Sequence, residues 1–99
     1  MSEKKTYELS RHFSKLENLQ NEKTLTYSVL DRGGGSVISL KGTSRDRIYT
    51  ESCFLPGTGF AYAKSIAVLL CENSFDIGTW KEALDDIGIR YILTESQAS

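Results

Sequence analysis

The longest nearly unbroken apolar run of the chain covers residues 60–71, FAYAKSIAVLLC. Its apolar residues recur at helical spacing, and Thr58 stands where an N-cap residue is expected. The pattern predicts a buried helix over about 59–72. The side chains expected to face a sheet are Phe60, Ala63, Ile66, Ala67 and Leu70.

Upstream, the pattern changes to a period of two. Leu25, Tyr27 and Val29 alternate with Thr and Ser, which is typical of a half-buried strand beginning near Lys23. Three glycines, 33–35, predict a hairpin loop over 31–36, because glycine supplies positive φ and weakens the interior of an element. The returning strand is predicted over 37–40, a turn over 42–46, and a further strand over 48–55 that stops at Pro56.

The N-terminal segment fits two templates. Tyr7, Leu9 and Phe13 fit a strand with Arg11 as the exception, whereas Leu9, Phe13, Leu16 and Gln20 fit a helical face. We favour a strand over about 6–14, followed by a connection over 18–22, because Thr, Tyr, Ser and His suit a strand as well as a helix.

A second, short helix is predicted over about 79–87. Thr79 and Glu82 have capping-box spacing, Trp80, Ala83, Leu84 and Ile87 form one stripe, and Gly88 follows. Residues 89–93 either add an edge strand or pack under the helices, and residues 1–5 and 94–99 are expected to fray. The whole chain therefore predicts one α+β domain, a three- or four-stranded antiparallel meander with both helices on one face.

Composition adds few constraints on function. The 99 residues are 39% hydrophobic with a net charge of -1, which gives no overall attraction to nucleic acid or to an anionic membrane. Residues 1–50 carry nine Lys or Arg against six Asp or Glu, and residues 51–99 carry three against seven. The start of the chain shows no secretory signal and the apolar run is too short to span a membrane, so we expect a cytoplasmic protein. Cys53 and Cys71 are then expected to be reduced, buried thiols.

Three candidate sites for catalysis or ion binding have weak support in the sequence. The turn at 57–65 follows a strand and opens a helix, but Ala63 and Thr58 stand where a P-loop needs glycine, which leaves an anion site or a small enzyme site at Gly57–Tyr62 as a minor alternative. His12 has no nucleophile at a recognisable spacing. The acidic group Glu82, Asp85 and Asp86 is best explained as a solvated helix face. No catalytic residue, metal or cofactor is predicted.

Two binding hypotheses remain. Tyr62 and Trp80 are candidate anchors for a protein partner or a second copy of the chain, with core packing as the alternative for each. Arg32, Lys41, Arg45 and Arg47 on a sheet are candidate contacts to nucleic acid, because single-strand binders combine basic grooves with aromatic side chains.

The segments TLTYSV (24–29), AVLLCEN (67–73) and ALDDI (83–87) together resemble a small domain family of unknown function from Firmicute bacteria. The chain departs from that family at Ser28, where glycine is usual, and in PGTGFA at the start of the long helix. The resemblance implies an α+β fold and a Gram-positive bacterial origin, and it carries over no functional residue. The leading hypothesis is a non-catalytic protein-interaction or regulatory module that uses an exposed sheet face or the Trp80 helix, and the alternative is a small nucleic-acid-binding protein.

Overall fold

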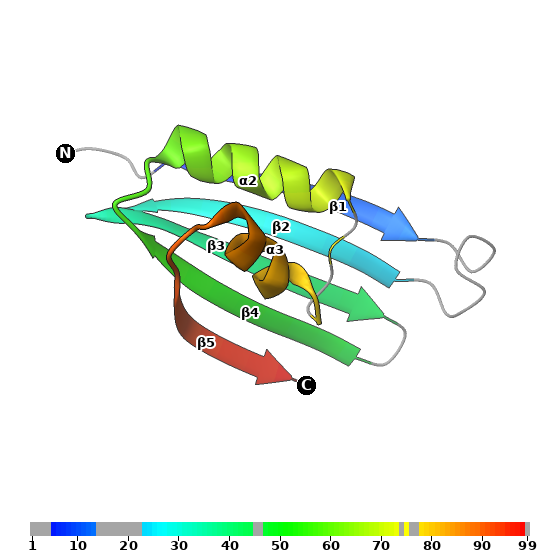
Figure 1. Cartoon of the computed structure of the whole chain (residues 1–99). Helices are drawn as coiled ribbons and strands as arrows, with labels where there is room; N and C mark the ends of the chain where they lie inside the picture. The colour runs from blue at the N-terminus through cyan, green and yellow to red at the C-terminus, as the bar shows by residue number, and fades with distance from the viewer. Residues whose placement is uncertain (1–4, 14–22, 45–46, 74, 76–77, 99) are drawn as a thin grey trace.

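In the part of the chain that it describes, the computed structural model has one antiparallel sheet and two helices (Figure 1). It describes residues 5–13, 23–44, 47–73, 75 and 78–98. The strands follow one another as neighbours in the order β1-β2-β3-β4-β5. Their bounds are β1 Thr6–Phe13, β2 Lys23–Arg32, β3 Gly35–Ser44, β4 Arg47–Pro56 and β5 Ile92–Ala98; the helices are α2 Phe60–Glu72 and α3 Trp80–Ile87.

The α+β class and the positions of both helices agree with the sequence, but the sheet has five strands rather than three or four. The fifth strand is β5, which pairs with β4 from Phe54↔Ile92 to Tyr49↔Ala98, with a register shift between Ser52 and Cys53. Residues 94–98 thus belong to a strand where fraying was expected. Its polar sequence after Leu93 lacks an alternating pattern, so only the pairing with β4 identifies it.

The hairpin between β2 and β3 is tighter than the glycine run suggested. Arg32 pairs directly with Gly35, and only Gly34 of the three glycines has a positive φ, 83°. Gly35 is the first residue of β3. Glycine is required there because a Cβ would come within 2.2 Å of the Leu55 carbonyl oxygen. Residues 42–44 of the predicted turn at 42–46 belong to β3, which continues to Ser44, and residues 45–46 lie outside the described residues.

Both helices cover the same face of the sheet (Figure 1). The alternation predicted for β2 is realised, because every second residue from Leu25 to Val29 is buried there. The same face of β3 and β4 supplies Ile38, Leu40, Cys53 and Leu55; α2 contributes Ala63, Ile66, Ala67, Leu70 and Cys71, and α3 contributes Trp80, Ala83 and Leu84. Phe60 packs at the margin of this core.

Polar contacts position α2 and the segment after it. The Arg11 guanidinium donates to the carbonyl oxygens of Cys71 and Glu72, each at 3.2 Å, at the C-terminal end of α2, where a cation is favourable. This contact explains why an arginine interrupts the apolar alternation of β1. The buried Tyr27 hydroxyl donates to the Phe75 carbonyl oxygen at 2.6 Å and so holds the chain beyond α2.

The helix starts differ from the predicted caps. Gly59, rather than Thr58, is the N-cap residue of α2, and it has no side-chain cap. Thr79 is the N-cap residue of α3, as predicted, but its side chain makes no capping hydrogen bond. Gly88 ends α3 with a φ of 85°, as its position suggested. No helix in the described part of the chain has the length and apolar character needed to cross a membrane.

Candidate functional site

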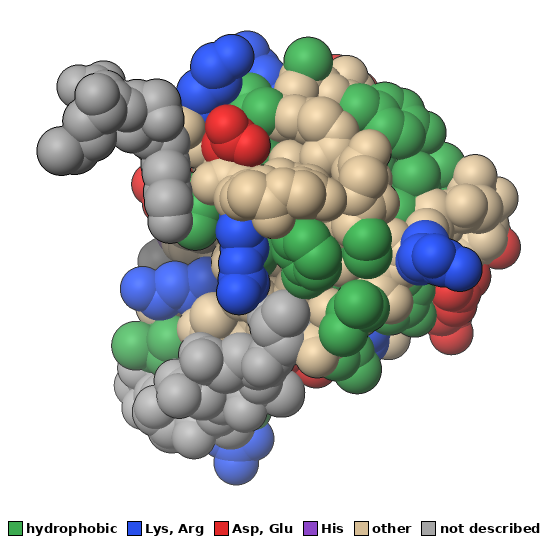
Figure 2. Space-filling view, turned by 90° about the vertical axis from the view of Figure 1, so that its left-hand side faces the viewer, with side chains coloured by type: hydrophobic (Ala, Val, Ile, Leu, Met, Phe, Trp, Pro, Cys, Tyr) green, Lys and Arg blue, Asp and Glu red, His purple; other side chains and the backbone are tan. Residues whose placement is uncertain are grey.

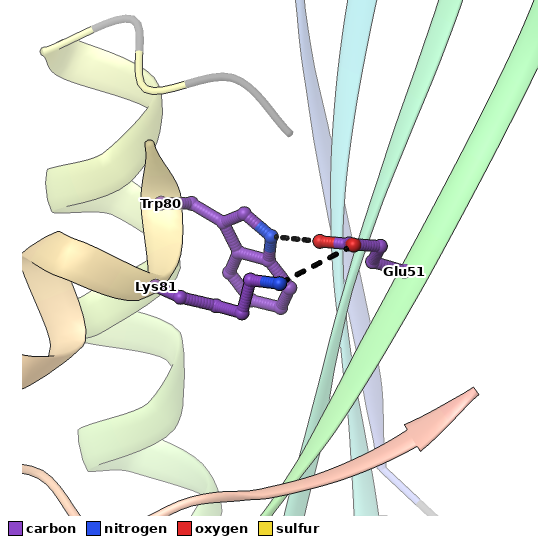
Figure 3. A network of polar contacts seen from close by, with 3 residues as sticks. All are labelled: Glu51, Trp80 and Lys81. Atoms are coloured by element: carbon purple, nitrogen blue, oxygen red, sulfur yellow. Dashed lines mark hydrogen bonds and ion pairs between the residues drawn. The ribbon is translucent and has the colours of Figure 1, made fainter. Parts of the chain in front are cut away.

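A group of polar contacts joins β4 to α3 (Figure 3). Glu51 faces the helices because it pairs with the buried Leu40 across the ladder. Its carboxylate accepts a 2.8 Å hydrogen bond from the Trp80 indole N–H and lies 3.4 Å from the Lys81 ammonium group. The Glu51 side chain is only 14% exposed. One carboxylate therefore holds both the first and the second residue of α3 against the sheet.

Cys53 lies two residues further along β4, on the same face. Burial raises the pKa of its thiol from 9.0 to about 11, the neighbouring Lys81 charge opposes that rise, and Glu51 adds to it. A cysteine nucleophile must be a thiolate. The Cys53 thiol is protonated at neutral pH and fully buried, so this region provides no activated nucleophile.

The other titratable groups around α3 are Tyr91 and three carboxylates. Burial raises the pKa of the Tyr91 hydroxyl, and the charge and hydrogen bond of Asp85 raise it further. Glu82, Asp85 and Asp86 are exposed on α3. Within the described ranges, no group of three or more His, Cys, Asp and Glu side chains could hold a metal ion. The contacts of Glu51 with Trp80 and Lys81 dock α3 against β4.

The structure separates the two predicted protein anchors. Trp80 has no exposed surface, so its prediction as a partner contact gives way to its alternative, core packing. Its apolar stripe and its hydrogen bond to Glu51 explain why: the indole needs one acceptor when buried, and β4 supplies it. Tyr62, by contrast, is 51% exposed on α2.

The predicted basic residues do not converge. Arg32 and Lys41 face away from the helices, but the ladder places Lys41 opposite Thr26, six residues from Arg32, about 20 Å along the strand. Arg47 lies on the helix-covered side, on the same face of β4 as Tyr49 and Glu51. Its guanidinium stacks 5.8 Å from the Tyr49 ring centre and donates to the Tyr49 hydroxyl. Arg45 lies outside the described residues. The three described cations thus form no continuous basic groove.

The Gly57–Tyr62 turn is tied to the neighbouring hairpin. The Gly57 N–H donates to the Gly34 carbonyl oxygen at 2.7 Å, and the Ser36 hydroxyl donates to the Thr58 carbonyl oxygen at 2.9 Å. The ammonium group of Lys64 lies 4.5 Å from the centre of the Tyr7 ring on β1. These contacts anchor the turn and direct Lys64 to the Tyr7 ring, and the anion or enzyme site at Gly57–Tyr62 stays a prediction.

The remaining candidate is the face of the sheet that points away from the helices, which we call the open face. Among the described residues, no helix or strand covers it (Figure 1). Half of the side chains that the central strands β2, β3 and β4 present there are Ser or Thr. Some hydroxyl groups of the open face bond to each other: Ser39 to Ser52 at 2.8 Å, and Ser10 of β1 to Thr26 at 3.1 Å. His12 of β1 lies here too, 3.0 Å from the Thr24 hydroxyl.

An apolar row crosses the open face near the β2–β3 turn. The ladder pairs Leu30 with Val37, Val37 with Phe54, and Phe54 with Ile92, which places one apolar side chain on each of four strands. The first three are half-buried and Ile92 is 54% exposed. The Arg32 guanidinium stacks 5.3 Å from the Phe54 ring centre.

Figure 2 views the end of the molecule that carries the β2–β3 and β4–α2 turns. Hydrophobic side chains reach the surface there in several groups between Lys and Arg side chains. The apolar row was missed in the sequence, although a signal existed: Leu30, Val37 and Phe54 occupy the positions of their strands where the alternation calls for polar residues.

Comparisons with models of protein families, with curated proteins and with solved structures found no match for this chain. The similarity to a Firmicute domain family therefore stays a prediction.

Proposed function

We propose that this protein is a non-catalytic interaction module that binds another protein chain through the open face of its sheet. The observation that carries the proposal is the apolar row Leu30, Val37, Phe54 and Ile92 on a face that no described element covers. Four neighbouring apolar side chains at the surface mark a binding surface more often than isolated ones do.

The rest of the open face supports the same role. Arg32 and Lys41 are the only charged residues among the described side chains that β2, β3 and β4 present there. Depletion of charge is typical of the centre of a protein interface. Hydroxyl groups that bond to each other, as in Ser39 and Ser52, lose fewer hydrogen bonds to water when a partner covers them. Their burial therefore costs less free energy.

Photo-crosslinking in the cells from which the chain comes tests this role. A photoreactive phenylalanine analogue is placed at Lys41, exposed on the open face, and, as the matched control, at Ser65, exposed on α2. We expect a covalent protein adduct from position 41 and none from position 65. Absence of any adduct at position 41, or equal adducts at both positions, would overturn the proposal.

A further inference from the structure

We infer that the chain on the open face is a second copy of this protein, so that two sheets stack face to face about a two-fold axis. The inference rests on the proposed function and names its partner. Three properties of the open face support it: its area, the fit of the apolar row to itself, and the position of its charges.

The open face has the area that a stable dimer needs. In the arrangement described below, the four strands β2 to β5 overlap and β1 lies outside the overlap. Four strands spaced by about 4.8 Å, with the central ones ten residues long at about 3.3 Å per residue, span about 19 by 33 Å, or about 630 Å². A protein interface of standard size buries about 600–1,000 Å² on each partner. The overlap includes the hydroxyl-lined part of these strands.

The apolar row matches a copy of itself. An axis that runs along the strands between β3 and β4 places Val37 over Phe54 of the second copy and Leu30 over Ile92 of the second copy, because all four share one level of the ladder. The same operation places Ser39 over Ser52, so small hydroxyl residues face each other. Stacked sheets with nearly aligned strands are a common packing, with their backbones about 10 Å apart.

The charges of the open face tolerate this arrangement. Lys41 comes to face Thr50 of the second copy rather than another lysine, since Lys41 and Thr50 share a level on the two strands that flank the axis. Lys41 lies three residues from the end of β3, so its long side chain can extend along the strand and keep the ammonium group in water at the margin, which a lysine in the apolar row could not do. Arg32 lies beyond the apolar row, at the end of β2, where it stays at the margin and covers the Phe54 ring. A partner with a strong charge of either sign would find few complementary groups at the centre of this face.

Sedimentation equilibrium of the purified chain at several concentrations tests the inference. We expect a species with twice the mass of one chain. Val37→Lys should raise its dissociation constant at least about 100-fold, because each copy would bury an unpaired ammonium group. Ser65→Lys adds the same charge on α2 and should leave the dissociation constant unchanged. Circular dichroism establishes that each variant is folded, and Ser39→Lys provides a second probe of the centre of the face.

The outcomes separate the two proposals. A monomer at all concentrations, or a dimer that withstands both Val37→Lys and Ser39→Lys, overturns the second copy as the occupant. If position 41 then still crosslinks in cells to a chain of another mass, the interaction module stands with a different partner. If position 41 crosslinks to nothing, both proposals fail.

Discussion

The two faces of the sheet differ in the burial and the type of the side chains that the same strands present. On the helix-covered face, Tyr27, Ile38, Leu40 and Leu55 have no exposed surface. On the open face, their neighbours in sequence are hydroxyl residues, members of the apolar row, Lys41 and Pro56. Since alternate residues point to opposite sides, a shift of register by one residue would exchange the two sets. The covered face therefore fixes the register, and the open face can vary in composition without loss of the fold.

The largest difference between the faces should appear with a buried charge. Ala67 of α2 is fully buried against the covered face, so Ala67→Asp should lower the free energy of unfolding by about 4 kcal/mol or more and leave the chain largely unfolded. Lys64→Ala, on the same helix, removes only the contact to the Tyr7 ring and should cost about 0.5–1 kcal/mol. Urea unfolding followed by circular dichroism measures both, and a stable, folded Ala67→Asp variant would contradict the packing described for α2.

Two substitutions in β3, one on each face, compare the two faces within a single strand. Leu40→Ala opens a cavity under the helices and should cost about 2–5 kcal/mol, whereas Val37→Ala, on the open face, should cost no more than about 1 kcal/mol in the monomer. The measurement is urea unfolding at a concentration low enough to keep the chain monomeric. Equal losses would mean that the open face is covered within the single chain.

A smaller effect concerns pH. Because the folded state holds the pKa of Cys53 at about 11 against 9.0 in the unfolded chain, the unfolded thiol loses its proton first. Stability is thus unaffected by this group below about pH 9 and decreases as the pH rises towards 11, by about 2–3 kcal/mol in all.

The control for this effect is Cys53→Ala. Thermal or urea unfolding between pH 8 and pH 11 should show a shallower loss of stability in the variant than in the natural chain, because Cys71 and Tyr91, whose pKa values are also raised, remain in both. Identical slopes in the two proteins would show that the Cys53 thiol ionises as readily in the folded state as in the unfolded chain.

Much of the covered face could be predicted from residue order alone. The alternation around Tyr27, the helical stripe through Ala67 and the stripe through Leu84 each depend on neighbours within one element, so periodicity reveals them. The strand choice for 6–14 was correct as well, although Arg11 interrupted its pattern. The reason for that arginine lies 60 residues away, at the end of α2, and no local pattern contains it.

The candidate site was far less predictable. Trp80 has the same sequence pattern whether its ring is buried or exposed, and only the position of Glu51 on β4 shows that the indole is buried with its N–H paired. Arg32 and Lys41 lie far apart along the open face, and Arg47 lies on the other face of the sheet. These positions depend on pairing between distant segments. Local periodicity thus determined the positions of both helices and of β2, β3 and β4, and the buried stripes of β2 and α2. Only the tertiary structure decided that β5 forms an edge strand beside β4 and that Leu30, Val37, Phe54 and Ile92 form one row. The reason is that cross-strand pairing joins residues with no fixed spacing in the sequence.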